Sequence, residues 1–177
     1  MKKVSLKPFN ETSLKEIWKQ GFSTEQPEWT KFNAPYFNDY QKYSSFNLFK
    51  ESPIADFLFG DDCRCIVVND QPIGMVSKDW IDEQTRWLEI GIVIYDSTKW
   101  SGGYGTVALQ LWTNEIFQSI DKLEHIGLTT WSGNPSMMRV AEKLGFQKEA
   151  RIRKVRYYNG KYYDSVKYGI LREEWEN

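Results

Sequence analysis

The feature that most constrains this chain is a glycine-rich turn, Trp100-Ser101-Gly102-Gly103-Tyr104-Gly105-Thr106, set between two apolar segments. The β-branched run Ile90–Ile94 precedes the turn, and the amphipathic run Val107–Ile120 follows it. A strand, a glycine turn and a helix start together form an anion site. Glycines allow several backbone N–H groups to converge, and the helix dipole adds positive potential. The turn therefore predicts a ligand that carries phosphate.

Two common phosphate-binding motifs do not fit this turn. The spacing Gly103-x-Gly105-x-x-Ala108 matches the dinucleotide fingerprint formally. That fold also needs an acidic residue at the end of the next strand, where this chain has Thr130-Trp131-Ser132-Gly133. A nucleotide P-loop needs G-x-x-x-x-G-K-[ST], which the sequence lacks. The sequence therefore predicts another class of phosphate ligand.

The length of 177 residues predicts a single domain over residues 1–177, which we expect to be cytoplasmic. The formal net charge of −1 argues against nucleic acid as a partner. The basic run Lys148–Arg156 alternates with apolar residues and is typical of the solvated face of a strand. No apolar run reaches transmembrane length, and the N-terminus lacks the apolar core of a signal peptide, so no membrane contact is expected.

Cysteine and histidine are too rare here for the usual metal or triad chemistry. Cys63 and Cys65 are the only cysteines, and their spacing on one strand suits two structural thiols better than a disulfide. One C-x-C pair does not make a four-ligand zinc site, so no metal is expected. His125 is the only histidine, and it begins an apolar run that predicts a buried strand, so we expect it to be structural.

Hydrophobic periodicity predicts a mixed α/β sheet. The expected strands are Val4–Phe9, Cys65–Val68, Ile73–Trp80, Arg86–Tyr95, Ile126–Trp131, Phe146–Tyr158 and Lys161–Leu171. Asn159-Gly160 joins the last two as a tight hairpin. The expected helices run from Thr12 or Ser13 to Lys19, from Tyr104 to about Gln118, and from Asn134 to Leu144, where Gly145 ends the last one. We expect Ala108, Leu111, Trp112 and Ile116 on the buried side of the second helix.

Residues 20–50 are unusually rich in aromatic side chains. Pro35 is a plausible first helical residue, and Tyr36, Tyr40, Tyr43 and Phe46 follow it at helical spacing. Such a helix either covers the core or forms one wall of a pocket, and both can hold, because aromatic rings offer a large apolar surface with a polar tip. The residues that we assign to substrate binding on this basis are Trp29, Tyr36 and Tyr40.

Three motifs in register resemble the GNAT superfamily of acetyl-CoA-dependent N-acetyltransferases. The glycine turn is similar to the pyrophosphate-binding turn of that family. The segment Asn134–Phe146, with its Glu-Lys-Leu-Gly-Phe ending, is similar to a later helix of the family. The hairpin around Asn159-Gly160 resembles the RimJ/RimL-like branch. The resemblance implies a mixed, mostly antiparallel seven-stranded sheet with helices on both faces, and direct acetyl transfer from acetyl-CoA to an amine.

The resemblance also implies the roles of individual residues. The central strand would pair with the pantetheine arm, the turn would hold the pyrophosphate, and the start of the later helix would contact the rest of the cofactor. The cofactor-binding residues implied are Gly91, Ile92, Val93, Ile94, Trp100, Ser101, Gly102, Gly103, Tyr104, Gly105, Thr106, Asn134 and Ser136.

The catalytic groups are less closely defined by the resemblance. Glu89 lies on the central strand where the family often places a carboxylate, so it is the candidate base, with an ordinary cross-strand ion pair as the alternative. The tyrosine that many members use to protonate the CoA thiolate corresponds to Ala141 here, and the serine of the RimJ/RimL-like branch corresponds to Met137. Tyr104 and Ser132 are the other candidates for this proton.

The acceptor amine stays open in the sequence. A protein N-terminus, a polyamine and an amino-sugar antibiotic are all compatible with the resemblance, and a homodimer is possible. These departures from the family pattern also allow a non-catalytic acyl-CoA-binding module.

Overall fold

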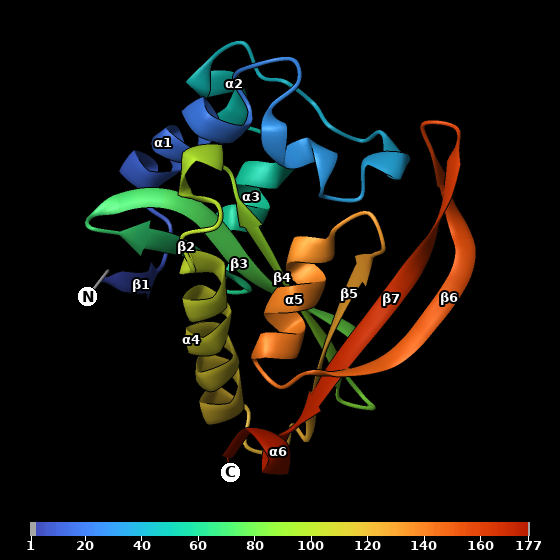
Figure 1. Cartoon of the computed structure of the whole chain (residues 1–177). Coiled ribbons are helices and arrows are strands. Elements are labelled where there is room, and N and C mark those ends of the chain that lie inside the picture. The colour runs from blue at the N-terminus through green and yellow to red at the C-terminus, as the bar shows by residue number, and fades with distance from the viewer. Residues whose placement is uncertain (1–2, 177) are drawn as a thin grey trace.

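The computed structural model describes residues 3–176 and is built on a seven-stranded sheet in the order β1-β2-β3-β4-β5-β7-β6 (Figure 1). Every neighbouring pair is antiparallel except β4 and β5, which are parallel. The predicted mixed, mostly antiparallel sheet is therefore confirmed. The strands are β1 Val4–Lys7, β2 Cys63–Val68, β3 Gln71–Asp82, β4 Trp87–Ile94, β5 His125–Trp131, β6 Gln147–Tyr158 and β7 Lys161–Leu171.

Helices cover both faces of the sheet, as expected. On one face lie α4 (Tyr104–Ser119) and α5 (Pro135–Lys143), side by side in Figure 1. Their apolar sides pack with the sheet into a core that includes Leu88, Trp112 and Tyr168. The other face packs against α1 (Glu11–Gly21), α2 (Phe46–Lys50) and α3 (Pro53–Phe59) through a second core. The short α6 (Arg172–Glu176) ends the described chain.

Two tight turns fix the register of the hairpins. Asn159 and Gly160, between β6 and β7, both have positive φ angles (47° and 74°), as the predicted Asn-Gly turn requires. Asn69 and Asp70 form an equivalent turn between β2 and β3, with φ angles of 48° and 63°. Asn, Asp and Gly all tolerate this left-handed backbone, so the turns cost little strain.

Several local expectations are wrong in detail. The side chain that caps α1 is Asn10, which accepts from the Ser13 amide at 2.8 Å in a capping box, so neither Thr12 nor Ser13 is the cap. On α4, Leu111 is 36% exposed while Leu109 is buried. Helix α3 was not among the predicted helices, although Ser52 caps it and Pro53 stands at its first position.

The aromatic segment is not the helix that its spacing predicts. Residues 27–45, here named the aromatic strap, contain two 3₁₀ turns, Glu28–Lys31 and Pro35–Phe37. Ala34 and Asn38 take left-handed conformations (φ 47° and 51°) at the two ends of the second turn and stop any helix there. The strap instead packs its rings in different directions.

Strands β4 and β5 part soon after they begin. Their parallel pairing consists of Leu88 opposite Ile126 and Glu89 opposite Gly127. From Ile90 to Ile94, β4 pairs with β3 alone among the described residues. The sheet thus opens into a V whose wide end lies beside the N-terminus of α4. The strand carries backbone donors and acceptors along this opening.

In the part of the chain that the structure describes, no helix is both long and apolar enough to cross a membrane.

Candidate active site

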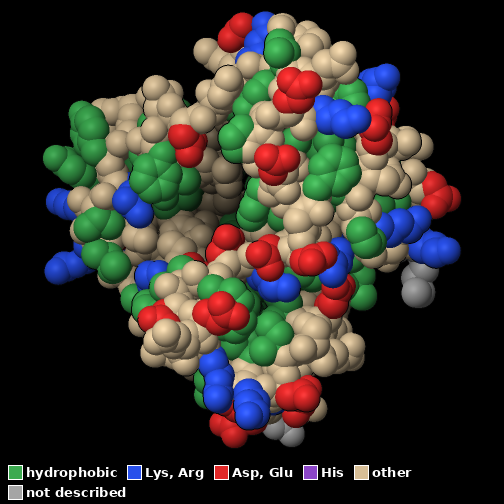
Figure 2. All heavy atoms as spheres, turned by 180° about the vertical axis from the view of Figure 1, so that it is seen from behind, with side chains coloured by type: hydrophobic (Ala, Val, Ile, Leu, Met, Phe, Trp, Pro, Cys, Tyr) green, Lys and Arg blue, Asp and Glu red, His purple; other side chains and the backbone are tan. Residues whose placement is uncertain are grey.

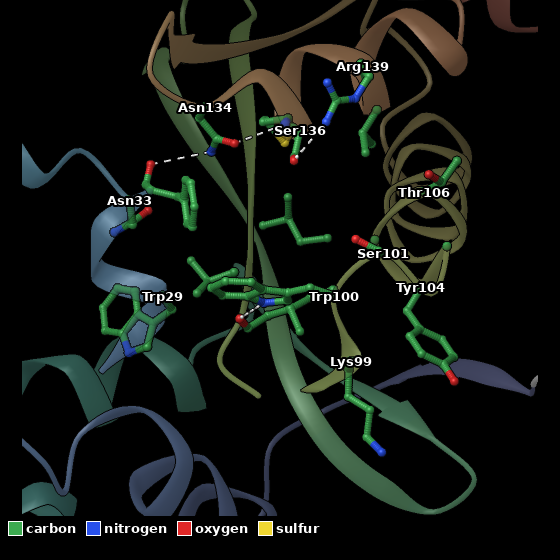
Figure 3. A pocket seen from close by; sticks show the side chains of 18 of the residues that line it. Trp29, Asn33, Lys99, Trp100, Ser101, Tyr104, Thr106, Asn134, Ser136 and Arg139 are labelled. Atoms are coloured by element: carbon green, nitrogen blue, oxygen red, sulfur yellow. Dashed lines mark hydrogen bonds between the residues drawn. The ribbon is translucent and has the colours of Figure 1, made fainter. Parts of the chain in front are cut away.

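A pocket of about 440 Å³ occupies the wide end of the V. Four elements line it: the end of β4 (Ile92–Ile94), the glycine turn with the first turn of α4, one side of α5, and the aromatic strap. Figure 3 shows these elements around one hollow, with Ser101 and Thr106 facing Asn134 and Ser136 across it. The structure therefore brings together most of the residues that the sequence assigned to the cofactor.

The glycine turn starts α4 without any side-chain cap. Gly103 is the N-cap residue in a left-handed conformation (φ 81°), and it makes no side-chain cap hydrogen bond. A Cβ on Gly103 would have no heavy atom within 4 Å, so this position is open space above a helix start. A Cβ on Gly102 would lie 2.6 Å from the Tyr104 ring, so its lack of a side chain allows that ring to pack closely. An open and uncapped helix start attracts an anion.

Three cations line the same pocket as this helix start, and none of them is among the residues predicted for the site. Lys99 precedes the turn, while Arg139 and Lys143 lie one helical turn apart on α5, and all three line the pocket. The lining includes no Asp or Glu. The i, i+4 spacing of Arg139 and Lys143 could have indicated this site, since α5 directly follows a strand that borders the V.

Hydrogen bonds clamp the aromatic strap onto the pocket. The Trp131 indole N–H donates to the Phe32 carbonyl (2.8 Å), and the Asn134 amide nitrogen donates to the same oxygen (3.4 Å). The Phe32 ring packs edge-on to Trp100, with ring centroids 5.4 Å apart. Trp100 in turn donates its indole N–H to the Ile94 carbonyl (3.0 Å). The strap thus forms one wall of the pocket, and Trp100 joins it to β4.

The assigned residues of α5 have structural partners as well. Asn134 caps the helix, since its Oδ1 accepts from the Met137 amide at 3.1 Å. Ser136 Oγ accepts from the Arg139 guanidinium at 3.3 Å. Both residues line the pocket while making these bonds, so their side chains are already oriented.

The three residues assigned to substrate binding do not share one site. Trp29 is buried, lines the pocket and donates its indole N–H to the Gly21 carbonyl. Tyr40 packs on Phe22 and Trp29 and donates to the Thr24 carbonyl, away from the pocket. Tyr36 packs edge-on against Trp131. Of the three, Trp29 lines the pocket, and the assignment of all three to substrate binding stays a prediction.

Glu89 lies at the closed end of the V, on the sheet face opposite α4 and α5. It accepts hydrogen bonds from Thr129 (2.7 Å) and from the Lys167 ammonium (2.9 Å), which also contacts Thr129 at 3.0 Å. Gly127 leaves room for this carboxylate, since a Cβ there would lie 3.2 Å from Glu89 Cγ. This geometry is compatible with both roles expected for Glu89. The carboxylate forms a cross-strand ion pair, and it stands where the two strands separate, as a catalytic base would.

The surroundings of the neighbouring carboxylate, Asp79, disfavour its charged form. Asp79 lies opposite Glu89 in the β3–β4 register. Burial raises the pKa of Asp79, and the carboxylates of Asp62 and Glu89 raise it further. Two carboxylates thus lie side by side on β3 and β4, and Lys167 pairs with the one on β4.

The two candidate proton donors occupy different surroundings. Tyr104 lines the pocket, but in Figure 3 its ring points away from Asn134 and Ser136. Ser132 Oγ accepts from the Asp164 amide at 2.9 Å, which ties the end of β5 to β7.

The two cysteines are buried, and the histidine lies beside a carboxylate. Cys63 and Cys65 are buried and unpaired thiols, and burial raises the pKa of each to about 12. His125 Nε2, on β5, lies 2.9 Å from Glu149 Oε1, on β6. Over residues 3–176, no group of three or more His, Cys, Asp or Glu side chains could hold a metal ion.

Comparison with known proteins identifies the class that this fold and site define. The family model described as "Acetyltransferase (GNAT) domain" matches residues 3–147, so the chain belongs to the GNAT acetyltransferases.

Curated relatives come from Bacillus subtilis (strain 168). "Putative ribosomal N-acetyltransferase YdaF" is 32% identical over 104 residues, which cover 58% of this chain and 55% of that protein. "SPbeta prophage-derived uncharacterized N-acetyltransferase YokL" is 42% identical over 53 residues, 30% of each chain. The chain thus spans about half the length, or less, of the curated relatives it matches.

Solved structures share the fold at low identity. The acetyltransferase (GNAT family) from Bacillus anthracis superposes with a TM-score of 0.75 at 18% identity, covering 98% of this chain and 100% of that one. The spermidine N-acetyltransferase from Vibrio cholerae, in complex with CoA and spermine, gives a TM-score of 0.74 at 21% identity, with 98% of both chains covered.

Proposed function

We propose that this protein is a cytoplasmic, RimJ/RimL-like N-acetyltransferase that transfers the acetyl group of acetyl-CoA to a primary amine. The observation that carries the proposal is the open edge of β4 leading to an uncapped helix start with three cations around it. This is the arrangement that a long ligand with a peptide-like arm and phosphates at one end requires.

In this proposal the cofactor lies along the V. The pantetheine arm pairs with the backbone of Gly91–Ile94 and extends the sheet as a strand would. The pyrophosphate sits on the glycine turn, and Lys99, Arg139 and Lys143 neutralise the phosphates. The thioester then points to the closed end of the V, because the phosphates are fixed at the wide end.

The reaction in this geometry is direct attack of the amine on the thioester carbon in a ternary complex. Holding both reactants in place lowers the activation barrier by roughly 7–11 kcal/mol. The C–N bond forms as the C–S bond breaks, the amine loses a proton, and the CoA thiolate leaves with a hydrogen bond or a proton. Tyr104 and Ser132 remain the candidates for that donor.

Glu89 is the proposed acceptor of the amine proton. Deprotonating a lysine-like amine of pKa ~10.4 at pH 7 costs about 4–5 kcal/mol, whereas an α-amine near 7.7–8.0 costs about 1–1.5 kcal/mol. Because Lys167 and Thr129 already bond to Glu89, this carboxylate is held in place. The smaller cost of deprotonation favours an α-amine as the acceptor.

The test has two stages. A saturating amount of acetyl-CoA should raise the melting temperature, since a ligand at 100 times its dissociation constant adds about 2.7 kcal/mol. Thiol release with amine acceptors should follow, and Glu89→Gln should lower kcat by about 10²-fold or more while the acetyl-CoA dissociation constant stays unchanged. An unchanged kcat in this variant would remove Glu89 from the mechanism.

A second candidate function is a non-catalytic acyl-CoA-binding module. It is favoured by Ala141 and Met137, which stand where the family's tyrosine and serine are expected, with Met137 lining the pocket. A thermal shift with acetyl-CoA, together with no thiol release for peptide, polyamine and amino-sugar acceptors, would support this module over the enzyme. A homodimer is a further prediction, tested by light scattering.

A further inference from the structure

A primary amine of the chain itself lies beside the proposed base. The Lys167 ammonium donates to Glu89 Oε1 at 2.9 Å and to Thr129 Oγ1 at 3.0 Å. The Thr129 hydroxyl donates in turn to the other carboxylate oxygen, Glu89 Oε2, at 2.7 Å. The three side chains therefore form a closed ring of hydrogen bonds, which fixes the position of the amine.

This ring bridges the two arms of the V. Glu89 belongs to β4, and its pairing with Gly127 is the last backbone pair before β4 and β5 separate. Thr129 lies two residues further along β5, and Lys167 lies opposite Thr129 on β7. The Lys167 side chain thus crosses over β5 to reach Glu89, and its amine stands where the V begins to open.

The amine is held in place without being sealed off. Figure 2 shows the face opposite α4 and α5, where a hollow lies between two lobes and acidic and basic side chains border it together. The Lys167 side chain keeps 35% of its surface exposed, whereas the Glu89 side chain keeps 16%. The ring of Trp87 lies 5.9 Å from the ammonium. A ligand that enters the V can therefore reach this amine.

Lys167 differs from the other lysines by its position. The sequence contains 16 lysines, and within residues 3–176 no other lysine forms a salt bridge with Glu89. Lys99 and Lys143 line the pocket, but that pocket lies at the wide end of the V, where the proposed function places the phosphates. Lys50 forms a comparably short ion pair, 2.7 Å, outside the pocket. An amine paired with the proposed base occurs at Lys167.

The proposed reaction requires an amine at the place that Lys167 occupies. A base must lie within hydrogen-bond reach of the proton that it takes, about 2.6–3.2 Å between heavy atoms. The Lys167 nitrogen meets this condition at 2.9 Å from Glu89. The acetyl group is brought to the same end of the V, because the pyrophosphate is held at the wide end and the pantetheine arm runs along β4.

We infer that Lys167 is a site of self-acetylation, where bound acetyl-CoA modifies the protein that holds it while no acceptor is present. The inference rests on the proposed function and goes beyond it, since the group that is acetylated belongs to the enzyme. The Lys167 nitrogen forms a bond to the thioester carbon as the C–S bond breaks. Of the two protons that the ammonium loses, one passes through Glu89 to the solvent and the other goes to the leaving thiolate, so the products are acetyl-lysine and CoA.

This modification changes the charge beside the base. The amide nitrogen of acetyl-lysine is neutral, so Glu89 loses the cation that pairs with it. A lysine ammonium gives up its proton less readily than an α-ammonium does. Self-acetylation should therefore be slower than turnover of an α-amine, although it has to occur only once in each molecule.

The experiment follows every lysine by peptide mass spectrometry after the purified protein is mixed with acetyl-CoA whose acetyl group carries a heavy carbon isotope. Uncatalysed acetylation should favour the exposed Lys122 and Lys154 over the half-buried Lys167. We expect the reverse order, with Lys167 labelled about tenfold faster than either. An excess of free CoA should suppress the label at Lys167 and leave the label at Lys122 and Lys154 unchanged, because only Lys167 depends on bound cofactor.

Three variants test how the label arises. Glu89→Gln keeps the lysine but removes the proton acceptor, so the rate of labelling at Lys167 should fall by about 10²-fold or more. The matched control Glu11→Gln removes the carboxylate that pairs with Lys50, a Lys–Glu pair outside the pocket, and should leave the label at Lys167 unchanged. Lys167→Arg keeps a cation beside Glu89 and offers no amine, so the label should disappear from this position. An undiminished label in Glu89→Gln would overturn the inference.

The remaining outcomes separate the inference from the proposed function. Suppose that acetyl-CoA raises the melting temperature and amine acceptors release thiol, but Lys167 is labelled no faster than Lys122 and Lys154. The inference is then overturned, the proposed function stands, and the pair of Lys167 with Glu89 is structural. A labelling rate per molecule that rises with protein concentration would show transfer between molecules and would also overturn the inference. The absence of both a thermal shift and thiol release would instead refute the proposed function.

Discussion

Two glycines of the same turn should respond to alanine in opposite directions. Gly103 has a φ of 81° and open space around its Cβ position, so Gly103→Ala introduces backbone strain and no clash. That strain costs roughly 1–2 kcal/mol. Gly105 lies inside α4 without a positive φ, and its added Cβ would meet Ile94 and Ile92 methyl groups at ordinary distances of 3.6 and 3.7 Å. Gly105→Ala should therefore stabilise the helix by about 0.5–1 kcal/mol.

Thermal unfolding measures both effects. For a domain of this size, 1 kcal/mol corresponds to roughly 2–4 °C, so Gly103→Ala should lower the melting temperature by about 2–8 °C and Gly105→Ala should raise it by about 1–4 °C. Acetyl-CoA at saturation should stabilise both variants less than the wild type. The first lacks the turn conformation that gathers the N–H groups, and the second places a methyl group in the pocket.

The reasoning has two separate points of failure. An unchanged melting temperature for Gly103→Ala would show that the turn does not depend on the left-handed residue. A full acetyl-CoA shift for Gly105→Ala would show that the ligand phosphates do not approach this part of the backbone.

Three further predictions concern other parts of the molecule. Trp131→Phe removes the 2.8 Å bond to the Phe32 carbonyl, so it should cost about 1 kcal/mol and speed proteolysis within the aromatic strap, which limited digestion would reveal. Asp79→Asn should raise the melting temperature at pH 7. Burial and two carboxylates raise the folded-state pKa of Asp79, so the wild type loses stability as the pH rises from the ordinary pKa toward the folded-state pKa. The variant should lose its advantage near and below pH 3.8, the ordinary pKa of this group. Equal melting curves at pH 7 would contradict this. Burial raises the pKa of Cys63 and Cys65 to about 12, so a thiol reagent at pH 8 should modify neither in the native protein and both after denaturation.

Much of the fold could be predicted from the sequence, because its signals are local. The Asn159-Gly160 turn, the β-branched central strand and the helix stop at Gly145 each determine their own element through short-range physics. The position of the glycine turn also located one end of the pocket, since an uncapped helix start is a property of neighbouring residues.

The remainder of the site depends on contacts between distant segments. The aromatic strap has helical spacing, yet its backbone follows tertiary anchors, with the Phe32 carbonyl bonded to residues 99 and 102 positions away. Lys99 and Arg139 line one pocket only because α5 packs beside α4. Likewise, the Lys167 partner of Glu89 arises from strand order, which places β7 beside β5, and no local pattern carries that information.

The two-residue pairing between β4 and β5 has a kinetic consequence. The strands form two half-sheets, β1–β4 and β5–β7, that share very few backbone hydrogen bonds. In the proposed function, the cofactor bound between them would act as a temporary strand that has to be removed and replaced in every catalytic cycle. The backbone groups that give affinity for the donor also retain the spent thiol, so release of CoA, and not acetyl transfer, is expected to limit the steady-state rate.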